Sequence, residues 1–184
     1  MGRKSSFEAG RVLAAAGAQI IEAGSFTLDG LTQATGVSIG SLYHRFGSRE
    51  ALLAEAWLDA LKRFQSAFQV ALGGDVDGAI LATPRFCRAE PDAAALLACC
   101  RKSEFVGPAT LASIRNEIDE LNTSGETALR RFARGKRRPL LSCRLALVAY
   151  PLAAVRLYLP NAPVPTRLDR EILKAGHAAL AQAG

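Results

Sequence analysis

Residues 27–50 read TLDGLTQATGVSIGSLYHRFGSRE, and this stretch decides the fold. Thr27 and Ser38 each stand where a helix N-cap accepts a backbone hydrogen bond, so two short helices are expected after them. The first ends at Thr35-Gly36 and the second near Phe46-Gly47. Gly36 supplies the backbone conformation that a side chain resists in a tight turn. The spacing predicts a helix-turn-helix.

The apolar residues around this turn are spaced to hold the second short helix at a fixed angle. Leu31, Val37, Leu42 and Phe46 are placed to pack against an earlier helix, expected over about residues 5–23. A short helix alone is unstable in water, so this packing is essential to it. A helix held in this way can project into the major groove of DNA.

The remainder of the chain also has helical periodicity, so we expect an all-α protein. Segment 160–165 is expected to be a loop because it holds three prolines. We expect a helix-turn-helix domain at 1–47 and a second helical domain at 48–184, connected by a helix at 48–72. The other helices are expected at about 76–89, 92–102, 109–134, 140–158 and 167–182.

Composition and charge limit the class of protein. Hydrophobic residues make up 49% and charged residues 22% of the 184 residues, which suits a folded core. No run of 18 uncharged apolar residues and no secretory segment is found, so we expect a cytoplasmic protein. The net charge of +6 suits a polyanionic partner, although residues 1–63 contribute only +1 of it.

Motifs for catalysis or metal binding are not found in the sequence. It has no phosphate-binding glycine loop and no histidine at metal-ligand spacing, and its two histidines, His44 and His177, fall in different expected domains. We therefore expect no enzymatic activity, metal or cofactor. Four cysteines form no C-x-x-C pair and are expected to be small buried residues. A redox sensor at Cys99-Cys100 is the alternative.

The motif resembles a known family. The run Gly36-Val37-Ser38, then Leu42-Tyr43-His44 and Phe46, then Arg49-Glu50-Ala51-Leu52, is similar to the N-terminal signature of TetR family transcriptional regulators. The resemblance covers about residues 7–60. It implies that residues 1–47 form a three-helix DNA-binding domain and that residues 48–184 form a helical ligand-binding and dimerisation domain, with the helix at 48–72 connecting the two. One departure is Gly30, which costs about 1 kcal/mol inside the first short helix.

The resemblance also implies roles in binding double-stranded DNA. Base edges are expected to face the start of the recognition helix, which holds Ser38, Ile39, Gly40 and Ser41. Phosphates are expected to be bound by Thr27, Tyr43, His44 and Arg49. Arg45 is a further phosphate or groove-edge contact.

Two regions of the larger domain carry weaker expectations. The last two helices are expected to form a homodimer interface, with completion of the monomer core as the alternative; the interface candidates are Leu145, Val148, Leu152, Ile172 and Leu180. A small-molecule effector of unknown identity is expected among the middle helices, where plain core packing is the alternative; the candidates are Phe86, Cys87, Phe105, Leu111 and Ile114. A basic cluster at 130–138 is either a solvated helix end or an anion-binding surface.

The sequence therefore predicts a TetR-type regulator. We expect a repressor that binds a near-palindromic operator as a dimer and is released by its effector, with activation left open. The alternatives are a helical interaction protein, or a DNA-binding protein without ligand response or repressor role.

Overall fold

The computed structural model describes residues 2–99 and 112–181, and every regular element within these ranges is a helix. The chain divides into two compact units, residues 1–61 with 92–118 and residues 62–91 with 119–184. The described helices include none that is both long enough and apolar enough to cross a membrane.

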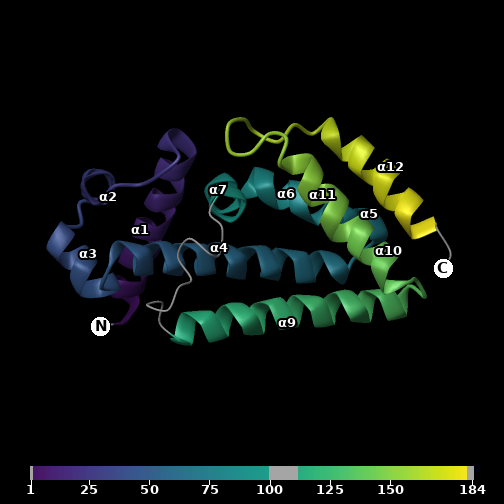
Figure 1. Ribbon diagram of the computed structural model, residues 1–184, viewed down its shortest axis with the longest axis horizontal. Helices are drawn as coiled ribbons and strands as arrows, with labels where there is room; N and C mark the ends of the chain where they lie inside the picture. The colour runs from purple at the N-terminus through teal and green to yellow at the C-terminus, as the bar shows by residue number, and fades with distance from the viewer. Residues whose placement is uncertain (1, 100–111, 182–184) are drawn as a thin grey trace. The chain divides into compact units, whose positions relative to one another are not determined.

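The first unit holds the predicted helix-turn-helix. Its helices are α1 (Gly2–Ala23), α2 (Leu28–Thr35), α3 (Ile39–Phe46), the first half of α4 (Arg49–Leu72), α7 (Pro91–Cys99) and the start of α9 (Ala112–Gly135). Figure 1 shows α1, α2 and α3 gathered at the beginning of α4. Their shared core is almost fully excluded from solvent; it includes Val12, Ile20, Phe26, Leu31, Leu42 and Leu52.

The second unit is built from the end of α4 and the further segments that the structure describes after it. These are α5 (Val76–Ile80), α6 (Ala82–Ala89), most of α9 (Ala112–Gly135), α10 (Leu140–Arg144), the π-helical turn η1 (Leu145–Ala149), α11 (Tyr150–Val155) and α12 (Leu168–Ala181). Helix α12 packs against α10, η1 and α11, as Figure 1 shows. Ile80, Leu147 and Ile172 form the centre of this core.

Prolines disturb two segments that we expected to be regular helices. The expected helix at 76–89 is two helices that meet at Leu81, because the ring of Pro84 excludes the carbonyl of Ile80 from a regular helix. The expected helix at 140–158 contains the π-turn η1, in which the Tyr150 N–H donates to the Leu145 carbonyl. Pro151 follows immediately, and the wider turn accommodates its ring.

Two close contacts attach α12 to the rest of the second unit. Arg88 of α6 donates two hydrogen bonds to the Asp169 carboxylate, at 3.0 and 2.8 Å. Gly176 lies so close to α5 that a Cβ atom there would stand 2.9 Å from Ile80. The first contact fixes the angle of α12 and the second its separation from α5.

Candidate nucleic-acid interface

Helix α2 begins and ends through local hydrogen bonds. The Gly30 N–H donates to Oγ1 of Thr27 at 3.1 Å, which confirms Thr27 as the N-cap. Gly36 ends the helix in the left-handed conformation, at φ 75°, and its N–H donates to the Thr32 carbonyl. The tight turn of the motif thus forms where the sequence predicted it.

Helix α3 buries one side and exposes the other. Leu42 and Phe46 are 1% and 6% exposed and anchor α3 in the core of the first unit. Ser38 caps the helix by accepting from the Ser41 N–H at 3.2 Å, and the two hydroxyl oxygens lie 2.9 Å apart. The remaining α3 residues are exposed; they are Ile39, Gly40, Ser41, Tyr43, His44 and Arg45.

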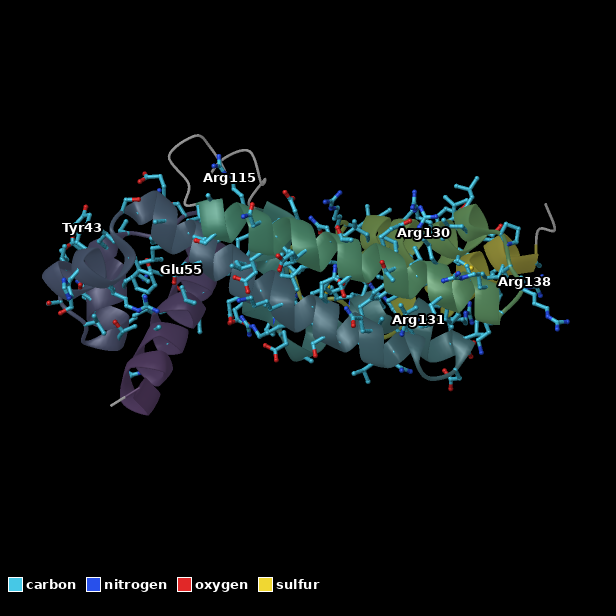
Figure 2. All side chains as sticks on the ribbon, turned by 90° about the horizontal axis from the view of Figure 1, so that it is seen from below. Tyr43, Glu55, Arg115, Arg130, Arg131 and Arg138 are labelled. Atoms are coloured by element: carbon cyan, nitrogen blue, oxygen red, sulfur yellow. The ribbon has the colours of Figure 1, made fainter. Side chains whose placement is uncertain are left out.

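The exposed side of α3 has the chemistry of a groove-reading surface. Tyr43 is 49% exposed and lies at the outer edge of the first unit in Figure 2. A Cβ atom built on Gly40 would have Ser38 Oγ, 4.0 Å away, as its nearest neighbour. The backbone at Gly40 is therefore open to close approach by another molecule. His44 and Arg45 add two basic side chains in the last turn. The exposed side of α3 thus combines hydrogen-bond donors (Ser41 and Tyr43) with the methyl groups of Ile39 and the basic side chains of His44 and Arg45.

Arg49 has a structural role that sequence reasoning missed. Its guanidinium donates to the Phe26 carbonyl at 3.0 Å and lies 4.5 Å from the centre of the Phe26 ring. These contacts tie the first turn of α4 to the segment before α2. They use only part of the guanidinium, which has five N–H donors. The predicted phosphate contact stays a prediction.

Gln19 is a second residue that the motif did not reveal. Its Oε1 accepts the backbone N–H of Thr27 at 3.1 Å, and its side chain occupies the space beside Gly30. A Cβ at position 30 would stand 2.7 Å from Gln19 Oε1, so an alanine there would displace the end of the Gln19 side chain. No local pattern indicates this contact because Gln19 lies eight residues from Thr27.

The effector candidates lie in different environments. Phe86 lines a cavity of about 540 Å³ in the second unit, between α4, α5 and α6, while Cys87 is buried without lining it. Burial raises the pKa of the Cys87 thiol to about 11. Ile114 is buried in the first unit. Phe105 and Leu111 lie outside the described residues, as does the side chain of Cys99 with Cys100.

The interface candidates divide into two groups. Ile172 and Leu180 are only 2% and 7% exposed in a single copy and lie in the core of the second unit. Leu145, Val148 and Leu152 are half-buried. The most exposed apolar side chains of α10 to α11 and of the turn after it are Leu141, Tyr150 and Leu157, and the five interface candidates include none of them.

Comparisons with known proteins agree with this geometry. Residues 12–56 match the family model described as "Bacterial regulatory proteins, tetR family". No curated protein sequence is a significant match.

Two solved structures have a similar fold. One is the TetR family transcriptional regulator PfmR from Thermus thermophilus, at TM-score 0.66 and 22% identity over 95% of this chain and 99% of that one. The other is a putative TetR-family transcriptional regulator from Mesorhizobium loti, at TM-score 0.64 and 12% identity over 96% of this chain and 95% of that one. Residues 12–56 are thus similar to the N-terminal domain of TetR family regulators, and the chain shares its overall fold with two solved structures.

Proposed function

We propose that this chain is a repressor that binds a near-palindromic DNA operator as a homodimer and leaves it when a small molecule binds. The observation that carries the proposal is the two-sided character of α3, with Leu42 and Phe46 buried and every other residue exposed. On this proposal residues 1–47 bind DNA, residues 48–184 dimerise and bind the effector, and the protein acts in the cytoplasm, where the operator is.

The first turn of α3 reads base edges. Ser41 donates or accepts at a base edge, and the exposed side chain of Ile39 contacts a thymine methyl group. Ser38 is held by its cap to Ser41, so the two hydroxyls meet the DNA as one fixed unit. Gly40 lets the backbone approach the bases.

Phosphates on either side of the groove position α3. Tyr43, His44 and Arg45 reach them from the exposed side of α3, while Thr27 does so from the start of α2. Arg49 uses the donors that its contact with Phe26 leaves over. About six to eight phosphates per dimer give a slope of log affinity against log salt of about −5 to −7.

A second copy of the chain covers the apolar side of the helix that runs through α10, η1 and α11. Leu141 and Tyr150 are 68% and 40% exposed on this helix, and Leu157, in the turn after it, is 81% exposed. Leu145, Val148 and Leu152 of the helix are half-buried. Ala149 and Ala153 are also exposed and allow close approach of a symmetry-related helix. One head reads few bases, and a two-fold dimer on a near-palindrome doubles the readout.

The effector binds in the cavity lined by Phe86. Its walls are mostly apolar, with Arg63, Arg85, Asp75 and Glu90 as the polar groups. Helix α4 contributes residues to this cavity and also begins in the DNA-binding unit, so it is one of the helices with residues in both units. A ligand that prefers one arrangement of the units shifts the population toward that arrangement and so changes DNA affinity.

The decisive experiment is selection of bound duplexes from random DNA with the purified full chain. The expected result is a discrete palindrome with two half-sites about one helical turn apart. Tyr43→Phe and His44→Ala weaken binding to it, while Gln33→Ala, an exposed change on α2, serves as the matched control. A pool without an enriched sequence, or binding that the α3 variants leave intact, refutes the proposal.

A further inference from the structure

The turn that joins α9 to α10 carries a concentration of positive charge that DNA reading by α3 does not use. Within nine residues lie five arginines and one lysine; they are Arg130, Arg131, Arg134, Lys136, Arg137 and Arg138. All are exposed. Figure 2 shows Arg130 and Arg131 on different sides of α9 and Arg138 in the turn beyond its end.

Four of these arginines share one concavity. Arg130, Arg134, Arg137 and Arg138 surround a hollow of about 360 Å³, with Ala133 and Leu140 as its apolar lining. No acidic residue contributes to this lining. We call this hollow the arginine concavity.

Acidic groups nearby do not neutralise the arginine concavity. Glu126 is shared between Arg130 and Arg144, at 2.9 and 2.8 Å, so it is already occupied. In the described part of the chain Arg134, Arg137 and Arg138 have no acidic partner. At least three positive charges therefore face the hollow without compensation.

The helix end does not need these side chains for capping. The backbone N–H groups of Lys136, Arg137 and Arg138 donate to the last carbonyls of α9, which closes the helix as a Schellman motif. Arg137 adopts the left-handed conformation, at φ 52°, where glycine is the favoured residue. An arginine is thus held in an unfavourable backbone conformation at the rim of the hollow.

We propose that the arginine concavity binds a small anion that carries two or more phosphate groups. Guanidinium groups match phosphate oxygens with paired N–H donors, and several converging guanidiniums suit a multiply charged ligand better than a monoanion. The half-buried side chain of Leu140 offers a contact to the organic part of such a molecule. A concave site of this size fits a small molecule, whereas the phosphates of duplex DNA lie on a convex surface.

Titration calorimetry with pyrophosphate, using the full chain at constant ionic strength, tests the proposal. Wild-type protein binds pyrophosphate, and acetate gives no heat. The double variant Arg134→Gln, Arg138→Gln binds at least about a hundredfold more weakly, because each loses charge-assisted hydrogen bonds. The control double variant Arg170→Gln, Lys174→Gln removes two exposed charges of α12 and keeps wild-type affinity. Arg134→Lys, Arg138→Lys keeps the charge but loses the paired donors, and binds about tenfold more weakly.

Arg137→Gly separates binding from folding. It relieves the left-handed backbone, so the Tm rises by about 2–4 °C while pyrophosphate affinity falls. The proposal is overturned if pyrophosphate gives no more heat than acetate, or if the α12 control weakens binding as much as the α9 variant does. It is also overturned if the Arg134 and Arg138 variants lower affinity for random-sequence duplex DNA but leave pyrophosphate binding unchanged, since the arginines then form a DNA contact.

Discussion

Replacement of Gly40 by alanine separates the stability of α3 from its function. The change adds one methyl group on the exposed side of the second residue of α3, where the nearest heavy atom is Ser38 Oγ at 4.0 Å. The protein therefore has room for the methyl group. Alanine exceeds glycine in helix propensity by about 1 kcal/mol in a helix interior, and by about half of that at this terminal position. We expect the Tm to rise by about 1–2 °C.

The same methyl group stands where base edges lie in the proposed complex. We expect the dissociation constant for the selected duplex to rise at least about tenfold, which corresponds to about 1.4 kcal/mol. The slope of affinity against salt stays unchanged, because no phosphate contact is lost. His44→Ala, in contrast, makes that slope less steep.

Fluorescence anisotropy with a labelled duplex gives the affinity, and thermal unfolding of the same sample gives the stability. Gly10→Ala is the matched control, because Gly10 is an exposed residue of α1 with nothing within 4 Å of its would-be Cβ. It stabilises its helix similarly and leaves DNA affinity unchanged. Gly40→Ala protein that is as stable as the wild type and binds the duplex equally well contradicts the placement of Gly40 against the bases.

Three further predictions concern the second unit. Gly176→Ala destabilises the protein by about 1–3 kcal/mol in urea unfolding, because the new methyl group overlaps the buried Ile80. The control Gly125→Ala destabilises it less, because its methyl group meets only the end of the flexible Gln65 side chain. The free energy of unfolding falls as the pH rises from about 9 to about 11, because burial raises the pKa of Cys87 to about 11 and the unfolded chain therefore loses this proton at a lower pH than the folded protein does. Cys87→Ala removes this part of the pH dependence. A Cys87→Ala profile that equals that of the wild type contradicts the prediction. Leu157→Arg converts the dimer to monomer in analytical ultracentrifugation without a loss of helicity, and a dimer that persists excludes Leu157 from the interface.

The sequence predicted the helix-turn-helix almost residue by residue because short-range signals determine it. Thr27, Gly36 and Ser38 act on groups within four positions of themselves, so their roles follow from local chemistry alone. Long-range contacts gave no such signal. The Gln19 side chain that fills the space beside Gly30 became evident only in three dimensions.

The larger unit was predicted less accurately, for two physical reasons. Pro84 and Pro151 interrupt segments whose apolar periodicity is otherwise helical, and we gave the periodicity too much weight. Burial in a core and burial at an interface also select the same residue types. Ile172 and Leu157 are both apolar residues near the C-terminus, but one is 2% exposed and the other 81%.

The two sides of α3 explain why the fold around this helix was easier to predict from the sequence than an effector site. Leu42 and Phe46 are buried and orient the helix. Their residue type and spacing are required for folding, and they also determine which side chains of α3 are exposed. An effector cavity has no comparable requirement. Its lining residues, such as Phe86, are apolar in the same way whether they pack a core or contact a ligand. The sequence pattern therefore does not distinguish a cavity from a core. Charge is the exception, because three uncompensated arginines around one hollow have no use in packing. The arginine concavity therefore indicates the chemistry of its proposed ligand, whereas the apolar cavity does not.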